Sequence, residues 1–501
     1  MQLKKGFPNG ERILSTEQVR AVEQRFPSIS QQVTRVLMQR AGEAAFALIK
    51  RCWPEARRLT VLCGNGNNGG DGFVVATLAA RAGFEVQILM PELDDSSGDA
   101  ADARASCPVK PKRFSVEALE HSDLIVDALM GIGLDGALRE PMRGIVEQVN
   151  AHAERSHVPV LALDIPTGLP SDGGKTEGPV LRASRTITFI ACKPGLLTDA
   201  GLDHVGTLEC ADLEIPEDCF SGIRRAAEWL AHRHWQPHLV PRPRGSHKGS
   251  NGHVLLIGGA PGMGGAIRLS GEAALRSGAG LTSLYCHQSA ANACLAARPE
   301  LMAHGFEQAP EPAALNRLID RATVLAAGPG LSQADWVPAL LNRLIETGKP
   351  LVLDADALNV LAKAPQPVPN AVLTPHPGEA ARLLNCSTAD IQADRLAAAN
   401  ALLDKYQAAA VVLKGAPSLI ADVERYTVLA EGNPAMASGG MGDVLTGIIA
   451  ALLAQGLSPL DAARLGASLH AWAGDCASRD IGQRGVLASD LFRYLPQGLS
   501  A

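Results

Sequence analysis

The sequence predicts an α/β fold made of two doubly wound domains. Its 501 residues are enough for two sizeable hydrophobic cores. Strand-like and helix-like segments alternate through most of the chain, which is typical of parallel sheets with helices on both faces. The alternation breaks once, in a segment rich in proline, histidine and tryptophan. We therefore expect a first domain over 1–220, a linker over 221–244 and a second domain over 245–501.

The first domain opens with a β-α-β unit. An apolar run over 59–63 predicts a buried strand, and a helical pattern over 72–82 precedes a second strand over 85–90. Further strands are predicted over 124–127 and 160–164, each followed by a loop with polar residues or glycines. Such sheets bind ligands at the carboxyl ends of their strands, so we expect a site there.

The second domain repeats the alternation with different motifs. Strands are predicted over 254–257, 324–327, 351–354 and 411–414. The chain contains no short internal repeat, and the glycine-rich motifs of its two halves differ. We therefore interpret the sequence as a fusion of two different α/β domains.

The composition excludes several classes of partner. Hydrophobic residues make up 46% and charged residues 20%, with a net charge of -6, so there is no positive excess of the kind that binds nucleic acid. The first residues lack the apolar core of a signal peptide, and no apolar run approaches the ~18 residues of a membrane span. We expect a cytoplasmic protein without nucleic-acid or membrane partners.

The 10 cysteines are scattered and form no Cys-x-x-Cys pair, which argues against a zinc or dithiol site. Cys63 lies beside the first glycine-rich loop, but no base is near it in the sequence. We interpret it as a buried, reduced residue of the core.

A glycine-rich loop follows the first predicted strand, with the sequence Asn65-Gly66-Asn67-Asn68-Gly69-Gly70-Asp71-Gly72. Together with Gly64 it fits the Gly-x-Gly-x-x-Gly fingerprint of dinucleotide-binding proteins, which is a weak pattern by itself. The Asp71 carboxylate would lie where the charge of a bound pyrophosphate belongs. The loop therefore disfavours an ordinary hydride-transfer site and indicates chemistry as well as binding.

A second loop, Ser438-Gly439-Gly440-Met441-Gly442-Asp443, precedes an apolar helix over 444–453. The N-terminus of that helix can hold the charge that develops on a transferring phosphoryl group. Asp443 can accept the proton of an attacking hydroxyl. This loop therefore predicts phosphoryl transfer.

Three strand ends supply uncharged or weakly charged oxygens, from Asn68, Asp127 and Thr167, which suit a hard cation of low charge density. The motifs Asn-Asn-Gly-Gly-Asp-Gly, Asp-Ala-Leu-Met-Gly-Ile-Gly, Asp-Ile-Pro-Thr-Gly and Ala-Cys-Lys-Pro-Gly, in this order, resemble the NAD(P)HX epimerase (YjeF N-terminal) family. The resemblance implies a Rossmann-like domain in which those oxygens bind K⁺ and Asp164 transfers protons. Met142 stands where an aromatic residue is expected in this family.

The same resemblance implies a set of residues that contact the hydrated nicotinamide nucleotide. They are Asn67, Asn68, Gly69, Gly70, Asp71, Gly131, Ile132, Gly133, Leu134, Asp135, Gly136, Ala137 and Asp164.

The second loop resembles the ribokinase-like superfamily, which transfers phosphoryl groups without a Walker A lysine. The other motifs of this half are Gly258-Gly259, Gly264-Gly265-Ala266, Gly328-Pro329-Gly330, Asp354-Ala355-Asp356, Thr374-Pro375-His376-Pro377-Gly378-Glu379, Lys414-Gly415-Ala416 and Asn433-Pro434. Together they resemble the ADP-dependent NAD(P)HX dehydratase family. The implied substrate contacts are Ala266, Gly330, His376 and Asp443, and the implied nucleotide contacts are Lys414, Gly415, Ala416, Pro417, Ser418 and Gly442.

The two resemblances imply a bifunctional repair enzyme for NADHX and NADPHX, the hydrated nicotinamide nucleotides. Its first domain interconverts the R and S epimers, and its second domain dehydrates the S epimer with Asp443 as base, consuming ADP and giving AMP and phosphate. K⁺ and Mg²⁺ are the implied cofactors, and we expect a homo-oligomer.

Two alternative functions stay open: a kinase that releases a stable phosphorylated product, and a first domain without catalytic activity.

Several residues also keep a structural interpretation. Asp164 could cap a helix, Asp127 could only accept backbone N–H bonds, and Lys193 could be structural or solvated. His376 could be structural as well. Asp354 and Asp356 could organise Mg²⁺ or cap a strand end, and the basic cluster of Arg242, Arg244, His247 and Lys248 could approach phosphates or belong to a solvated linker.

Overall fold

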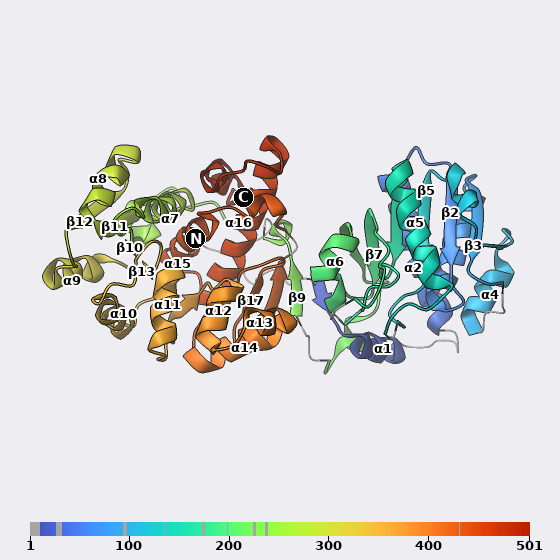
Figure 1. Cartoon of the computed structure of the whole chain (residues 1–501), viewed down its shortest axis with the longest axis horizontal. Coiled ribbons are helices and arrows are strands. Elements are labelled where there is room, and N and C mark those ends of the chain that lie inside the picture. Colours follow the sequence, from blue (N-terminus) through green and yellow to red (C-terminus); the bar gives the residue numbers. More distant parts are fainter. Residues whose placement is uncertain are drawn as a thin grey trace. The chain divides into compact units, whose positions relative to one another are not determined.

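The computed structural model describes residues 11–26, 33–93, 98–134, 136–172, 176–197, 199–223, 227–235, 239–429 and 431–500. Two compact units, Glu11–Ala226 and Ala227–Ala501, each contain a sheet and a hydrophobic core (Figure 1). Helices cover both faces of each sheet, so the predicted α/β class with two doubly wound domains is confirmed. Across the described ranges, no helix combines the length and the apolar character that crossing a membrane requires.

The sheet of the first unit has seven strands, in the order β4-β3-β2-β5-β6-β7-β8, and all its pairings are parallel. The strands are β2 (Arg58–Cys63), β3 (Glu85–Met90), β4 (Lys112–Arg113), β5 (Leu124–Ala128), β6 (Val160–Leu163), β7 (Arg185–Phe189) and β8 (Thr207–Ala211). Within this sheet the chain starts at the interior strand β2, runs through β3 and β4 to one edge, and then returns to β5 and continues to the other edge. A crevice between the loops that follow β2 and β5 results from this reversal.

Helices pack on the two faces of this sheet as separate layers. The helices are α1 (Thr16–Arg25), α2 (Val33–Cys52), α3 (Asn67–Arg81), α4 (Gly98–Ser106), α5 (Met142–Ser156) and α6 (Asp199–His204), and a short strand β1 (Glu11–Ile13) precedes them. Buried side chains of α1, α2 and α3 form the core on one face, and those of α5 form the core on the other. The crevice therefore lies within a fixed framework.

Helix α3 begins earlier than the sequence predicts, because the glycine-rich segment is itself helical from Asn67 onward. The glycines permit close packing: a Cβ on Gly69 would lie 1.9 Å from the carbonyl oxygen of Gly64, and one on Gly72 would lie 2.6 Å from the Cβ of Ala128. Asp71 consequently lies inside the helix rather than at its first residue.

The sheet of the second unit runs in the order β9-β18-β17-β16-β15-β14-β13-β10-β11-β12. The strands are β9 (Ala227–Leu230), β10 (His253–Ile257), β11 (Leu281–His287), β12 (Met302–Phe306), β13 (Val324–Ala327), β14 (Leu351–Leu353), β15 (Ala371–Leu373), β16 (Ala410–Leu413), β17 (Leu419–Ala421) and β18 (Tyr426–Leu429). Among the pairings that join these strands within the described residues, the two that involve β17 are antiparallel and the others are parallel. The segment 221–244, expected to be a linker, contributes strand β9, which pairs with β18. Trp229 and Leu230 of this strand are buried, so this part of the segment belongs to the second domain.

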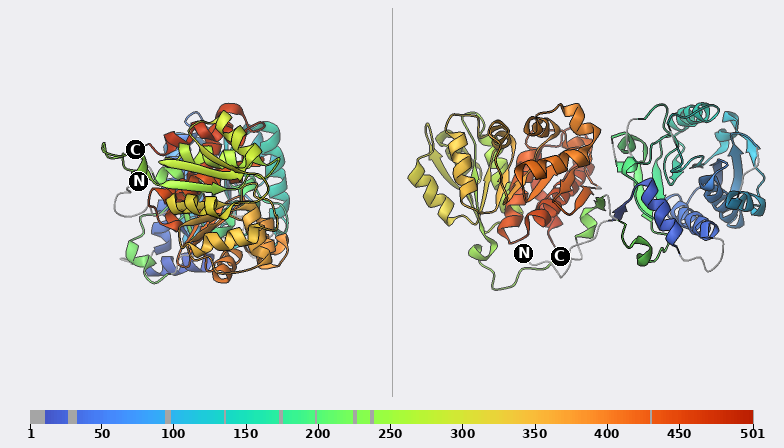
Figure 2. Two further views of the ribbon diagram at one scale, coloured as in Figure 1. Left: turned by 90° about the vertical axis from the view of Figure 1, so that its left-hand side faces the viewer. Right: turned by 90° about the horizontal axis from the view of Figure 1, so that it is seen from below.

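Helices cover both faces of this sheet as well (Figure 2). One face carries α7 (Gly264–Arg276), α8 (Gln288–Ala297), α15 (Met441–Ala454), α16 (Pro459–Ile481) and α17 (Leu495–Gly498). The other carries α9 (Pro312–Arg321), α10 (Val337–Glu346), α11 (Ala355–Lys363), α12 (Pro377–Leu384), α13 (Thr388–Ala393) and α14 (Arg395–Tyr406).

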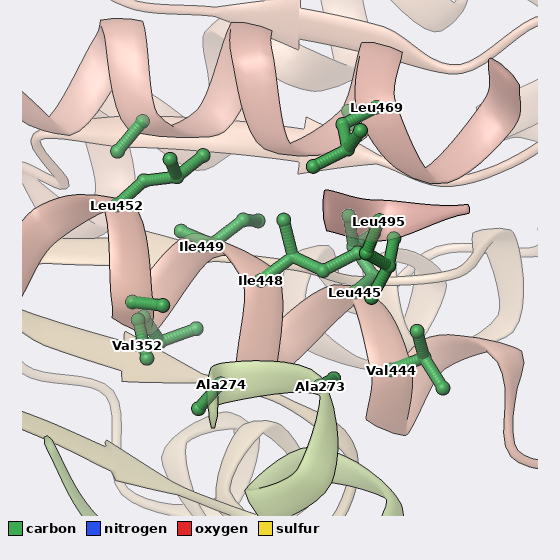
Figure 3. Close-up of a cluster of buried hydrophobic side chains, with 14 of the residues drawn as sticks. Ala273, Ala274, Val352, Val444, Leu445, Ile448, Ile449, Leu452, Leu469 and Leu495 are labelled. Carbon is green, nitrogen blue, oxygen red and sulfur yellow. The ribbon is translucent and has the colours of Figure 1, made fainter. Parts of the chain in front are cut away.

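Helix α15 is apolar on all sides because it lies between α7, α16 and the sheet (Figure 3). Ile448 at its centre is fully buried. We expect Ile448→Val to lower the free energy of unfolding by about 0.5–1.5 kcal/mol, since one methylene is lost and a small cavity stays behind. Denaturant unfolding checks this, with Leu295→Ala, an exposed position on α8, as the control that should change little.

Candidate active sites

The first unit contains a cavity of about 820 Å³ at the carboxyl ends of β2, β5, β6 and β7. Its lining includes residues of the α3 N-terminus, the loop after β5, and the polar face of α1. This is the crevice that the sheet order creates, and it is where doubly wound sheets bind ligands. The position agrees with the site expected from the sequence.

Asp164 follows β6 directly, and its backbone has a φ of 64°, a left-handed conformation that is uncommon for residues other than glycine. Its Oδ1 accepts hydrogen bonds from Lys193 Nζ at 2.5 Å and from Thr188 Oγ1 at 3.2 Å. The next residues form turns, so Asp164 does not cap a helix. The carboxylate is held in a strained, well-defined position at the cavity wall.

Lys193 is 1% exposed and lines the same cavity, so it is not a solvated side chain. Its ammonium also donates to Thr188 Oγ1 at 2.9 Å and to the carbonyl oxygen of Phe189 at 2.8 Å. All its donor positions are therefore used, and the Lys193–Asp164 pair is a rigid unit. Sequence reasoning did not assign Lys193 to the site, although the Ala-Cys-Lys-Pro-Gly motif was the available signal.

Two further carboxyl groups line the cavity, Asp71 on α3 and Glu23 on α1. Burial raises the pKa of Asp71 well above its usual value, and the nearby carboxylates of Asp164 and Glu23 raise it further. The pKa of Glu23 is raised in the same way, by burial and by Asp164, while Lys193 lowers it. The cavity thus combines an aspartate paired with an ammonium and two carboxyl groups that hold a proton more readily than usual.

Glu23 was missed from the sequence because α1 has the features of an ordinary amphipathic helix at the protein surface. Its N-terminus carries a capping box in which Ser15 and Gln18 each bond the other's backbone, and Val19 and Val22 face the core. Only the fold shows that the polar side of this helix faces the cavity.

The oxygens of the predicted cation site come from neighbouring strand ends. Asp127 is fully buried and accepts hydrogen bonds from Thr167 N at 2.9 Å, Thr167 Oγ1 at 2.8 Å and Leu129 N at 3.2 Å. The pKa of Asp127 is raised to about 6, because the effect of burial outweighs that of these hydrogen bonds, which lower it. Accepting backbone N–H bonds, the structural interpretation of Asp127, is therefore part of its role.

Asn68 is 7% exposed, and neither its Oδ1 nor its Nδ2 has a hydrogen-bond partner within the described part of the chain. An unpaired buried amide is costly, so its oxygen is available to a ligand. No lysine or arginine among the described residues forms an ion pair with Asp127. An orphaned amide oxygen and a buried carboxylate without a cationic partner fit a monovalent cation.

The other predicted contacts of the first site divide into three groups. Asn67, Asn68, Asp71, Gly131, Ile132, Gly133 and Asp164 line the large cavity, as does Met142. Leu134, Gly136 and Ala137 line a smaller cavity of about 210 Å³, while Gly69 and Gly70 are buried and contact Gly64 and Met38 instead. Asp135 lies outside the described residues.

Gly131 lies between two functional groups. A Cβ there would be 3.2 Å from Asp164 Oδ2 and 3.4 Å from the Cβ of Asn68. We expect Gly131→Ala to narrow the cavity and raise the KM of the first reaction about tenfold, while the free energy of unfolding changes by less than about 1 kcal/mol. Steady-state kinetics and thermal unfolding check both values, and Gly245→Ala, at an exposed position of the second unit where a Cβ meets open space, is the control.

In the second unit, Asp443 lies in the first turn of α15, and its carbonyl oxygen accepts a hydrogen bond from Ser270 Oγ at 2.8 Å. Gly440 precedes the helix with a φ of 91°, so glycine is favoured at this position. The pKa of Asp443 is raised to about 7, because burial and the charge of Asp354 raise it more than the charge of Lys414 lowers it. A carboxyl group with this pKa exchanges protons readily near neutral pH.

Lys414 connects the two predicted nucleotide-binding segments. Its Nζ donates to Asp354 Oδ1 at 2.8 Å and lies 3.7 Å from Glu379 Oε2. A Cβ on Gly442 would be 3.2 Å from the same nitrogen, so the ammonium lies beside the glycine-rich loop 438–443, which we call the anion loop because it is predicted to bind phosphate. Burial alone would lower the pKa of Lys414, but Asp354 and Glu379 raise it above its usual value.

The bonds of Asp354 and Asp356 show what these side chains do in the fold. Asp354 Oδ2 accepts a hydrogen bond from Thr446 Oγ1 at 2.9 Å, in addition to the bond from Lys414, so it connects β14 to α15. Asp356 accepts a hydrogen bond from the backbone N of Ser332 at 2.8 Å and so supports the loop that begins at Gly328.

His376 begins helix α12, and its Nδ1 accepts hydrogen bonds from Gly378 N at 3.0 Å and Glu379 N at 3.4 Å. Its Nε2 is 3.4 Å from Glu379 Oε1. The pKa of His376 is lowered by burial and by Lys414, against the effect of Glu379. His376 therefore does have the structural role considered for it, as a cap, and its contact with substrate stays a prediction.

The remaining predicted residues occupy loops at the same edge. Gly330 has a φ of 59°, and a Cβ there would be 3.3 Å from the Cβ of Ala266, so these two predicted substrate contacts are neighbours. Ala416, Pro417 and Ser418 follow Lys414, and Ser418 Oγ donates to the carbonyl oxygen of Gly415 at 3.2 Å.

The basic cluster before β10 is partly structural. Arg242 donates to the carbonyl oxygen of Gly278 at 2.5 Å and to Gln455 Oε1 at 2.9 Å, whereas Arg244 and Lys248 are exposed. Cys63 is buried, and burial raises the pKa of its thiol, which agrees with a core role.

The first unit thus has a cavity lined by carboxyl groups and a buried lysine, and the second has a glycine-rich loop beside Asp443 and Lys414. Two such sites on two different doubly wound domains are those of a bifunctional α/β enzyme. Residues 34–195 match the family described as YjeF-related protein N-terminus, and residues 254–497 match the family described as NAD(P)H-hydrate dehydratase. The chain belongs to the bifunctional NAD(P)H-hydrate repair enzyme family.

Named relatives match along most of their length. The chain is 44% identical to the bifunctional NAD(P)H-hydrate repair enzyme Nnr of Coxiella burnetii, over 92% of this chain and 93% of that protein. It is 45% identical to the Nnr enzyme of Escherichia coli, over 92% of this chain and 88% of that protein. A solved structure of the ADP/ATP-dependent NAD(P)H-hydrate dehydratase of Bacillus subtilis is 28% identical, with a TM-score of 0.48, and covers 55% of this chain and 98% of its own.

Proposed function

We propose that this protein repairs NADHX and NADPHX by epimerisation in its first unit and by ADP-dependent dehydration in its second. The observation that supports this most is that each unit has its own set of groups suited to proton transfer. In the first unit, Asp164, Lys193 and Asp71 line one cavity. In the second, Asp443 lies near Lys414 at the anion loop.

At the first site, the substrate would bind across the β2 and β5 loops, with its hydroxyl-bearing ring toward Asp164. A protonated carboxyl such as Asp71 can give a proton to the departing hydroxyl, and the carboxylate of Asp164 can take one from the returning water. Lys193 keeps that carboxylate oriented. Loss and return of the oxygen on the opposite face would convert one epimer to the other.

Asn68, Asp127 and Thr167 would hold K⁺ beside this cavity. The ion would supply positive charge that fixes the loops after β2, β5 and β6 and orients oxygen atoms of the substrate. Thr167 and Asp127 are already in contact, and the unpaired amide of Asn68 would complete the set.

We expect Thr167→Val to raise the K⁺ concentration for half-maximal epimerisation at least about tenfold, because a ligand oxygen is lost while the shape of the side chain is kept. Initial rates over a KCl series, at constant ionic strength with choline chloride, check this. Dehydration of the S epimer by the same variant should not change. An unchanged K⁺ response would contradict the assignment of Thr167.

At the second site, Asp443 would take the proton of the hydrate hydroxyl while its oxygen attacks the β-phosphorus of ADP and AMP leaves. The N–H groups at the start of α15 and the ammonium of Lys414 would stabilise the phosphoryl charge. Phosphate then leaves with the C–O electron pair as the ring nitrogen donates its lone pair, and the adjacent carbon loses a proton to give NAD(P)H. Mg²⁺ would accompany the nucleotide phosphates.

One assay separates this proposal from its rivals. The purified protein receives both hydrate epimers with ADP or ATP, K⁺ and Mg²⁺, and absorbance, phosphate and each epimer are followed. Regenerated NAD(P)H with stoichiometric AMP and phosphate supports the proposal, and an accumulating phosphorylated product would indicate a kinase. Loss of the S epimer alone would indicate an inactive first unit. A homo-oligomer and a cytoplasmic location remain predictions.

A further inference from the structure

An arginine outside every predicted site binds the backbone of the predicted nucleotide loop. Arg395 is the first residue of α14, and its Nη2 donates to the carbonyl oxygens of Leu413 at 3.1 Å, Lys414 at 3.4 Å and Pro417 at 2.9 Å. Its Nη1 donates to Gln392 Oε1 at 2.8 Å. One guanidinium therefore joins both ends of the segment 414–418.

The position of this arginine is unfavourable for the helix on which it lies. A cation in the first turn of a helix is repelled by the partial positive charge of the N-terminus. Asp394 caps α14 through the backbone N of Ala397, so the helix does not need Arg395 for its own start. The hydrogen bonds to the loop carbonyls offset this cost. We infer that the guanidinium stabilises the loop rather than the helix.

These bonds determine which way the loop presents its N–H groups. The Lys414–Gly415 and Pro417–Ser418 peptide bonds are trans, so the C=O and N–H of each plane point in opposite directions. Because the carbonyls of Lys414 and Pro417 point at the guanidinium, the N–H groups of Gly415 and Ser418 point away from it. Two N–H donors on the far side of a loop can hold an anion.

Gly415 supplies the space for this arrangement. Its φ is 151°, and a Cβ there would be 2.5 Å from Arg395 Nη1. A larger residue would therefore displace the guanidinium from the loop.

We propose that Arg395 is a positioning residue that holds the loop 414–418 in the shape that binds the phosphates of an adenine nucleotide, by turning the N–H groups of Gly415 and Ser418 away from itself. The proposal rests on the proposed function only in the identity of the nucleotide. Arg395 itself does not touch the nucleotide; it acts through the loop.

The test compares Arg395→Gln and Arg395→Lys with wild type, using ADP as the probe in calorimetry and in steady-state kinetics. Arg395→Gln should raise both the Kd and the KM of ADP about tenfold and leave the KM of the hydrate within about twofold, since the loss is confined to the nucleotide loop. Arg395→Lys should have Kd and KM values for ADP between those of wild type and Arg395→Gln. Its ammonium can bond some of these carbonyl oxygens but lacks the forked geometry of the guanidinium.

Arg343→Gln is the matched control. Arg343 is exposed on α10, bonds only a side chain, Asn316 Oδ1 at 3.2 Å among the bonds described, and should leave ADP binding unchanged. Arg395 variants that lose thermal stability but bind ADP like wild type would overturn the proposal. Wild-type protein that binds ADP without forming NAD(P)H would overturn the proposed reaction alone, because calorimetry still reports on the loop. Wild-type protein that binds no ADP would overturn both.

Discussion

Asp443→Asn is expected to reduce the kcat of ADP-dependent dehydration by about 10²- to 10⁴-fold, with little change in the KM of ADP. Asparagine keeps the size and most of the hydrogen-bonding capacity of the side chain but cannot accept the hydroxyl proton. The bond from Ser270 to Asp443 goes to the backbone, so α15 should keep its position in the variant. Formation of NAD(P)H from purified S epimer measures the effect.

The pH profile of the wild-type enzyme tests the same assignment independently. The pKa of Asp443 is raised to about 7 by burial and by Asp354. The base acts in its deprotonated form, so kcat/KM for dehydration should rise with pH through about 7 and level off above it. Lys414 lowers the pKa of Asp443, so Lys414→Met should move the rise to higher pH, in addition to weakening ADP binding.

Epimerisation by Asp443→Asn is the internal control, because it takes place in the other unit. It should proceed at the wild-type rate. A variant that keeps its dehydration rate, or whose pH profile still rises near 7, would remove Asp443 from the role of base.

The sequence was sufficient where the chemistry depends on residues close together in the chain. Short apolar runs ending in loops of glycine and polar residues predicted strands β2, β5, β6 and β16, and the segments that follow these strands carry many of the predicted site residues. Asp443 could be predicted to lie at the start of a buried helix because a glycine-rich turn, an acidic residue and an apolar run follow one another directly, and its role as base stays a prediction. Motifs made of neighbouring residues can be recognised from the sequence before the three-dimensional structure is known.

Long-range contacts were not predictable in the same way. Lys193 lies 29 residues after Asp164, and only the parallel pairing of β6 and β7 brings the two side chains to the same wall. Glu23 reaches the cavity through the packing of α1, and Arg395 contacts the nucleotide loop because α14 precedes β16. For Glu23 and Arg395, nothing in the local pattern differs from that of an ordinary surface charge, whereas Lys193 lies in the Ala-Cys-Lys-Pro-Gly motif.

The boundary between helix and loop was misplaced for a related reason. Glycines usually disfavour helices, so the segment after β2 was expected to be a loop with the helix starting at 72. Tertiary packing reversed this preference, because Gly69, Gly70 and Gly72 allow α3 to approach Gly64, Met38 and Ala128 more closely than any side chain would permit. The start of α3 at Asn67 then aims Asn67, Asn68 and Asp71 into the cavity.

Asp164→Asn is expected to lower the rate of R-to-S conversion by about 10²- to 10⁴-fold while dehydration of the S epimer continues at the wild-type rate. The substitution keeps the side chain's shape but removes the proton acceptor and the negative charge opposite Lys193. It leaves that buried ammonium without its carboxylate, so thermal unfolding must be measured as well, because an unpaired buried charge destabilises the fold.

A second variant separates catalysis from stability at this site. Lys193→Met removes the ammonium and keeps a similar length, and Asp164 would then stand beside Asp71 and Glu23 without a compensating charge. Lys193 lowers the pKa of Asp71 and of Glu23, so its removal should raise both pKa values and move the epimerisation optimum to higher pH. Chromatography of the epimers, starting from pure R epimer without ADP and corrected for spontaneous conversion, measures the rate at each pH. A folded Asp164→Asn variant that epimerises like wild type would show that the chemistry depends on Asp71 or Glu23 instead.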